Sequence, residues 1–157
     1  MDTDELTGLI VDTAFHVHRN LGPGLLESVY EMVLAAALQR RGLHVERQKP
    51  VAFTYGGMTF DEGFRVDLLV DERVVVELKS VEKLAPVHSK QLLTYLRLMK
   101  LPVGLLINFG AGTLKEGLHR IVNGYVPSAT PRLRVNQTGM GTGEGSRGGA
   151  ETRNESE

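Results

Sequence analysis

The sequence predicts an α/β domain whose mixed central sheet is flanked by helices, with an added helix at the N-terminus. Up to about Gly42 the apolar residues recur at helical spacing, and from Leu43 they alternate with a period of two. A further helical segment leads into the short, fully apolar run VGLLIN at residues 103–108. Three successive strands and a helical crossover into a fourth combine antiparallel with parallel pairing, so we expect a mixed sheet.

Two helices are expected before the first strand. In residues 4–19, Leu6, Ile10 and Val17 share one helical face, and the Asn-Leu-Gly-Pro-Gly segment at 20–24 ends this helix. The second helix is expected at residues 26–41, with Gly42 as its stop. Its predicted inward residues are Val29, Val33, Ala36 and Ala37, with Leu34 as a further candidate.

The remaining elements follow from the change of period. Strands are expected at residues 44–55, 58–70 and 73–80, with Pro50 indicating an edge strand or an irregularity and Gly56-Gly57 a turn. A helix is expected at residues 86–100, where Pro86 suits a first helical turn. A buried strand follows at residues 103–108, and residues 114–122 are compatible with either a short helix or a strand.

Composition restricts the class of protein. With 157 residues, 41% of them hydrophobic, the chain predicts one globular domain at residues 1–126 and a disordered tail at residues 127–157. The lack of cysteine excludes disulfides, iron–sulfur clusters and thiolate zinc sites. Neither a signal peptide nor a bilayer-spanning run is present, so we expect a cytoplasmic protein without membrane association. A formal net charge of −1 argues against coating of nucleic acid through bulk basic charge.

Three charged residues interrupt the two most apolar strands. Asp67 lies in the segment 58–70, and Glu77 and Lys79 lie in the segment 73–80. Buried carboxylates and ammonium groups are costly unless they are paired or bound to metal. Two carboxylates and the carbonyl of Leu78 could hold Mg²⁺ or Mn²⁺, while Lys79, on the same strand face as Glu77, could stabilise charge on a phosphate. The pattern suggests a metal-dependent phosphodiesterase centre.

This hypothesis makes a demand on the register of the hairpin. Asp67 and Glu77 share a face only if the hairpin is centred on Glu72, with an odd-length loop such as residues 71–73, or if a bulge shifts the register. A two-residue turn at Asp71-Glu72 would place them on opposite faces.

Each feature also has a plain structural explanation. Alternating charges on a strand usually form a solvated face with cross-strand ion pairs, although the apolar neighbours argue against this here. Glu27, which shares a helical face with Tyr30, could be a capping or dipole carboxylate. Gln91 and Tyr95 share a face of the later helix and on their own indicate no more than a polar rim.

Together and in this order, the residues resemble the PD-(D/E)xK nuclease superfamily, and more narrowly the small GxxExxY protein family. The family motif stands as GLLESVY at residues 24–30, followed by Asp67, by ELK at residues 77–79 and by QLLTY at residues 91–95. The resemblance covers about residues 6–123. One departure is Val66, which stands where the superfamily motif has a proline.

The resemblance implies a restriction-endonuclease-like αβββαβ core and a role for each motif residue. Glu27, Asp67 and Glu77 would be ligands of Mg²⁺ or Mn²⁺, and Lys79 would be the catalytic lysine. RecB-like relatives often use a histidine as an extra ligand, and His18 is the first candidate here, with His16 as the second. The substrate-side residues would be Tyr30, Gln91 and Tyr95.

Three functions remain open from the sequence. The leading hypothesis is a metal-dependent nuclease that hydrolyses DNA or RNA through a metal-activated water. The second is a catalytically silent nuclease-fold module that binds nucleic acid or a protein partner. The third is a purely structural α/β domain whose charges are paired. A chain of this size has few residues left for a separate specificity domain. A homodimer or a protein partner is therefore compatible with each of the three functions.

Overall fold

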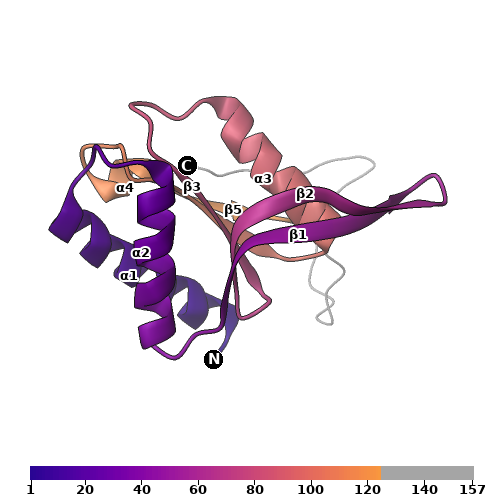
Figure 1. Cartoon of the computed structure of the whole chain (residues 1–157), viewed down its shortest axis with the longest axis horizontal. Coiled ribbons are helices and arrows are strands. Elements are labelled where there is room, and N and C mark those ends of the chain that lie inside the picture. The colour runs from indigo at the N-terminus through magenta and orange to yellow at the C-terminus, as the bar shows by residue number, and fades with distance from the viewer. Residues whose placement is uncertain (125–157) are drawn as a thin grey trace.

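The computed structural model describes residues 1–124, which form a five-stranded sheet with helices on both faces (Figure 1). The tail expected at residues 127–157 lies outside these residues. The α/β class and the predicted order of elements are confirmed. The elements are α1 (Thr3–Leu21), α2 (Glu27–Arg40), β1 (Val45–Tyr55), β2 (Met58–Val70), β3 (Val74–Lys79), α3 (Pro86–Met99), β4 (Val103–Asn108), α4 (Leu114–Gly117) and β5 (Leu118–Val122).

The sheet has the order β1-β2-β3-β4-β5. Neighbouring strands are antiparallel except for β3 and β4, which are parallel because α3 crosses over between them. Strand β1 lies at the edge of the sheet, as Pro50 predicted. The sheet is therefore mixed, as expected.

Both faces of the central strands are covered. Helices α1 and α2 pack on one face, where they meet Leu68, Val76 and Ile107. Helix α3 packs on the opposite face, against Leu69 and Val75. Successive residues of one strand thus enter different cores, which explains why β3 and β4 are almost continuously apolar.

Two expectations about local structure need comment. The predicted inward face of α2 was partly wrong: Ala36 is exposed, whereas Tyr30, Glu31 and Leu38 are buried. Apolar residues lie on almost every side of this helix, so spacing alone could not select the face that packs. Residues 114–122 form both expected elements in succession, α4 and then β5. No helix within residues 1–124 is long and apolar enough to cross a membrane.

Strands β1 and β2 extend well past the rest of the sheet. Strand β3 pairs with only three residues at the end of β2, whereas β1 pairs with β2 from Val45 to Tyr55. The outer part of the pair, residues 51–64, is a two-stranded ribbon that projects from the body of the molecule (Figure 1). We refer to residues 51–64 as the hairpin arm.

Candidate active site

The strands β2 and β3 are joined in two different ways along their length. Near their turn, backbone pairing links Leu68 with Val76 and continues to the loop. One residue further along, side chains replace this ladder. The amide of Asp67 donates to Oε2 of Glu77 at 2.8 Å, and the amide of Leu78 donates to Oδ2 of Asp67 at 2.8 Å. Two carboxylates thus hold the strands together where backbone pairing ends.

The predicted register of this hairpin is confirmed. Val70 pairs with Val74, which leaves the three-residue loop at 71–73 centred on Glu72. Asp71 and Glu72 both have positive φ, at 51° and 55°. The same register, extended by one pair, places Asp67 opposite Glu77.

The GLLESVY segment positions Glu27 through its own backbone. Gly24 has φ of 108°, a conformation that favours glycine, and Glu27 is the first residue of α2. Tyr30 is completely buried, and its hydroxyl donates to the carbonyl of Gly22 and accepts from the amide of Leu25 at 3.2 Å. Its ring stacks on Phe109 at 4.5 Å. Tyr30 therefore anchors the loop before Glu27, and its substrate-side role stays a prediction.

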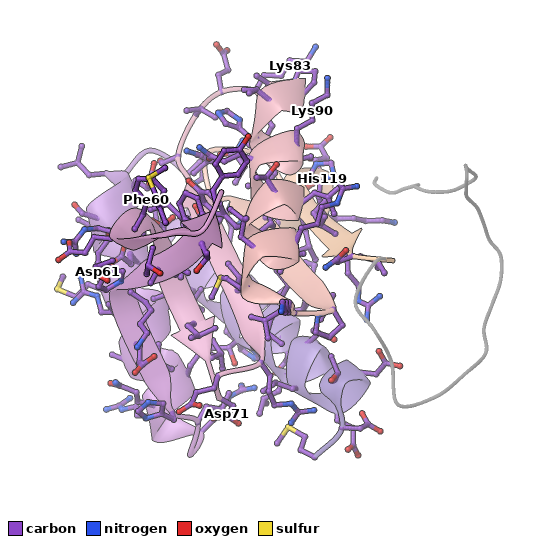
Figure 2. The ribbon with its side chains drawn as sticks, turned by 90° about the vertical axis from the view of Figure 1, so that its right-hand side faces the viewer. Phe60, Asp61, Asp71, Lys83, Lys90 and His119 are labelled. Atoms are coloured by element: carbon purple, nitrogen blue, oxygen red, sulfur yellow. The ribbon has the colours of Figure 1, made fainter. Side chains whose placement is uncertain are left out.

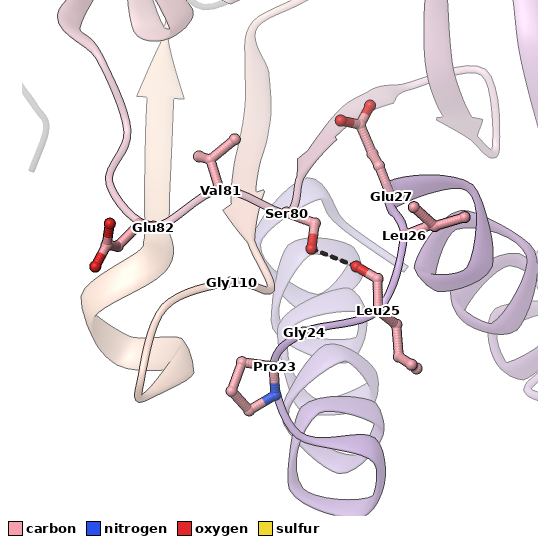
Figure 3. A pocket seen from close by; sticks show the side chains of 9 residues that line it. All are labelled: Pro23, Gly24, Leu25, Leu26, Glu27, Ser80, Val81, Glu82 and Gly110. Carbon is pink, nitrogen blue, oxygen red and sulfur yellow. Dashed lines mark hydrogen bonds between the residues drawn. The ribbon is translucent and has the colours of Figure 1, made fainter.

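Ser80 fixes this loop to the end of β3, and Asn108 fixes the residue after Ser80 to the end of β4. Ser80 donates from Oγ to the carbonyl of Leu25 at 2.6 Å (Figure 3). The amide group of Asn108, at the end of β4, bonds both the N–H and the carbonyl of Val81. A shallow pocket of about 460 Å³ lies between these segments, with Glu27 and Ser80 in its lining. The chain thereby brings the start of α2 to the end of β3.

The carboxylates form an electrostatically strained group. Glu77 is only 7% exposed, and burial, followed by the charge of Asp67, raises its pKa to about 8. Burial also raises the pKa of Asp67, although hydrogen bonds from Leu78 and Gln48 act in the opposite direction. Burial and the charge of Asp67 raise the pKa of Glu27. The positive charge of Lys79 offsets only part of this excess of negative charge.

Lys79 and helix α3 complete the surroundings of the carboxylates. Lys79 acts electrostatically on the three predicted carboxylate ligands, and it contributes, after burial, to lowering the pKa of His88. Burial, and then the charges of Glu77 and Asp67, raise the pKa of Tyr95. Gln91 lies one turn before Tyr95 and is exposed. Because Glu77 is buried, the solvated-face explanation does not hold for it.

Sequence reasoning missed Gln48, which bonds Asp67, and Glu31, which bonds Gln48. Glu31, one turn after Glu27, is buried and accepts hydrogen bonds from Arg47 at 3.1 Å and from Gln48 at 2.7 Å. The same Gln48 nitrogen donates to Oδ1 of Asp67 at 3.2 Å. Gln48 adopts φ of 50° within β1, which is uncommon for this residue type. The i, i+4 spacing of Glu27 and Glu31 was the only signal available in the sequence.

His18 lies in a different environment. It is buried, with Nε2 at 3.0 Å from the carbonyl oxygen of Ala111, so that nitrogen carries the proton and donates. Its ring centroid is 6.2 Å from that of Phe109. A metal would have to use Nδ1, and this contact supports a structural role; the additional-ligand role of His18 stays a prediction.

The donor atoms fit a hard divalent cation, although they do not form a ready-made cage. Within residues 1–124, no three His, Asp or Glu side chains are grouped closely enough to hold a metal ion. Carboxylate oxygens are nevertheless the ligands that Mg²⁺ and Mn²⁺ prefer. Burial is the main cause of the raised pKa values of Glu27, Asp67 and Glu77, and a bound cation would favour their ionised forms. Residues 1–124 donate no hydrogen bond to the second oxygen of Glu77, which leaves it available as a ligand.

Comparison with known proteins gives one match. A family model described as the PD-(D/E)XK nuclease superfamily matches residues 4–121. No curated protein and no solved structure matches the chain. The matched segment contains every residue of the candidate site.

Proposed function

The chain belongs to the PD-(D/E)XK nuclease superfamily, and on this premise we propose that it is a metal-dependent nuclease that hydrolyses phosphodiester bonds of nucleic acid. The observation that carries the proposal is the crossed pair of hydrogen bonds between Asp67 and the backbone and side chain of β3. These bonds hold the buried Glu77 and the half-buried Asp67 together beside Lys79, with Glu27 close enough to affect the pKa of Glu77. The intact GLLESVY segment supports membership of the GxxExxY group within the superfamily.

The proposed ligands are Glu27, Asp67, Glu77 and the carbonyl of Leu78. The amide of Leu78 points toward Asp67, and the N–H and carbonyl of one strand residue point to the same side, so this carbonyl faces the same opening. The carbonyl of Lys79, in contrast, accepts from the amide of Phe109 on the β4 side. Mg²⁺ or Mn²⁺ held there would polarise the phosphate and lower the pKa of a bound water.

The roles of the other residues follow from their positions. The Lys79 ammonium supplies a fixed positive charge beside the carboxylates, where it would orient the attacking water and stabilise charge developing on the phosphate. Tyr95 lies at the α3 side of the carboxylates and Gln91 is exposed one turn away, so both are proposed to contact substrate. Tyr30, Gln48 and Glu31 act indirectly, because they hold Glu27 and Asp67 in place.

A nuclease assay with matched lysine variants tests the proposal. Purified protein is incubated with single- and double-stranded DNA and RNA, with Mg²⁺, with Mn²⁺ or with EDTA. We expect metal-dependent cleavage that Lys79→Ala lowers at least a hundredfold and that Lys115→Ala, at an exposed lysine on α4, leaves unchanged. Absence of cleavage by the parent protein on every substrate would overturn the proposal, as would full activity in Lys79→Ala.

One observation favours a second candidate, a catalytically silent nuclease-fold module that binds nucleic acid or protein. The described residues contain no preformed group of three metal-ligating side chains. Titration calorimetry with Mn²⁺ separates the two candidates. Binding that is lost in Glu77→Gln supports the nuclease, whereas nucleic-acid binding without any Mn²⁺ binding supports the silent module.

A further inference from the structure

One face of the hairpin arm is apolar and rich in aromatic rings. The cross-strand pairs on this face are Val51 with Phe64, Phe53 with Phe60, and Tyr55 with Met58. The chain has five Phe and four Tyr residues, and four of these aromatic residues lie on this ribbon. Tyr55 is 73% exposed and Phe60 is 42% exposed, so the face lies open toward its tip.

The rings form a continuous row that is built into the backbone of the arm. Phe53 stacks on Phe60 with centroids 5.4 Å apart and meets Phe64 at 6.4 Å. The Phe53 ring lies directly over Gly63, where an added Cβ would approach it to 2.1 Å. Glycine at position 63 therefore makes room for the row.

The row leads from the tip of the arm to the candidate active site. Phe64 stacks on Tyr95 with centroids 4.2 Å apart and ring planes inclined by 11°. Tyr95 in turn lies within the electrostatic influence of Glu77 and Asp67. The aromatic face is thus continuous with the place where phosphodiester cleavage is proposed.

We propose that the aromatic face of the hairpin arm is a stacking platform for the bases of single-stranded nucleic acid, which it leads to the carboxylates. This inference rests on the proposed nuclease function, because it names the substrate class of the same site. Aromatic rings bind unpaired bases without sequence preference, whereas a duplex keeps its bases stacked and inaccessible. One strand of the arm, residues 51–55, spans about 13 Å, enough for at least two bases.

The chemistry of the arm favours nucleic acid over a second copy of this chain. Most side chains on the exposed face are aromatic rings and few are aliphatic. Self-association of a ribbon, in contrast, requires only apolar surface area. Positive charge is available beyond the row: Lys79 lies at the carboxylates, and Figure 2 shows Lys83 and Lys90 near the N-terminal end of α3, with Phe60 on the arm to one side. Rings suit the bases of a strand, and lysines suit its phosphates.

Binding is measured by fluorescence anisotropy in EDTA, with the full chain and a labelled 12-nucleotide single strand of DNA. A matched duplex and an abasic strand of the same length serve as probes with equal charge per phosphate. We expect the single strand to bind at least tenfold more tightly than either. The double variant Tyr55→Leu, Phe60→Leu keeps the apolar surface but removes two rings, and we expect it to weaken binding on the order of a hundredfold.

Controls exist on the same strands. Thr54 and Thr59 form the adjacent cross-strand pair on the opposite, polar face of the arm, with their hydroxyl oxygens 3.4 Å apart. Changing both to alanine should leave single-strand binding unchanged, and Tyr55→Trp should preserve it because the ring remains. Both leucine substitutions are at exposed positions, and circular dichroism checks that the fold is retained.

Several results would overturn the inference. The first is a lack of binding to the single strand. The second is an affinity for the duplex or the abasic strand that equals the affinity for the single strand. The third is unchanged binding by the leucine double variant. Light scattering that shows a dimer lost in an arm variant would assign the face to a second copy. The binding assay contains no divalent metal and so does not depend on cleavage. Ring-dependent binding by a chain that cleaves no nucleic acid in the nuclease assay would contradict only the nuclease proposal. Cleavage that is coupled to ring-independent binding would contradict only the role of the arm.

Discussion

The two ends of the β2–β3 pair are built on opposite principles. From Leu68 to Val76 and on to the turn, the strands are joined by backbone hydrogen bonds between buried apolar residues. At the other end, Asp67 and Glu77 are joined by their carboxylates to each other's strands. A part of the sheet that is stabilised by apolar burial is directly followed, one residue along each strand, by a part that concentrates carboxylates.

The difference shows that the candidate site lowers the stability of the fold. The apolar end gains from burial, whereas the carboxylate end holds Glu77 at a pKa of about 8, which reflects an unfavourable environment for its charge. Such an arrangement is typical of functional sites, where shifted pKa values concentrate. A substitution at one end of this pair should leave the other end intact.

The largest effect is expected from Glu77→Gln. It keeps the shape of the side chain but removes a proposed ligand, so metal-dependent cleavage should fall about a thousandfold. The matched control is Glu72→Gln, at an exposed carboxylate in the turn of the same hairpin, which should retain full activity. Initial rates with Mg²⁺ and Mn²⁺ measure both. Equal rates for the two variants would remove Glu77 from the site.

At the apolar end, Leu68→Ala should act on stability alone. Leu68 is completely buried, and its truncation should lower the free energy of unfolding by about 2–5 kcal/mol in urea titrations. Activity per folded molecule, measured well below the melting temperature, should remain close to that of the parent. A loss comparable with that of Glu77→Gln would show that the two ends are coupled.

The third largest effect is expected in the pH dependence of the free energy of unfolding, which should differ between the two ends of the β2–β3 pair. In EDTA, folded Glu77 keeps its proton up to a pH of about 8, whereas in the unfolded chain it loses the proton near its ordinary value of 4.5. The stabilisation from protonated Glu77 is therefore fully present below about pH 4.5 and is lost as pH rises through 8.

Unfolding free energies of the parent and of Glu77→Gln, measured from pH 4 to about 9, test this sign. Relative to the variant, the parent should lose on the order of a few kcal/mol across the range. A constant difference would contradict the raised pKa. Leu68→Ala, in contrast, should show the same pH dependence as the parent.

The smallest effect is expected from Gln48→Leu. The variant removes the amide that joins Glu31 to Asp67 but no proposed ligand, so Mn²⁺ affinity should fall about tenfold, as for other outer residues of metal sites. Calorimetry measures this, with Gln39→Leu at an exposed position of α2 as the control. An unchanged affinity would mean that Asp67 needs no support from β1.

Much of the fold followed from the sequence, because local patterns are strong here. The run at residues 103–108 is apolar on both sides, and β4 is buried along its whole length. The odd loop around Glu72 was required for Asp67 and Glu77 to share a face, and it is present. Where the pattern was weak it misled: α2 carries apolar residues almost all round, and the face that packs includes Glu31.

The sequence by itself determined the strands, their order and the charged residues that interrupt them, because side-chain periodicity and the cost of burying charge act locally. The tertiary structure alone decided what holds those charges. Tyr30 became a buried anchor, Gln48 on the neighbouring strand β1 bonded Asp67, and Ser80 tied the end of β3 to the loop before Glu27. Hydrogen bonds between side chains far apart in the sequence depend on geometry that only the packed fold supplies.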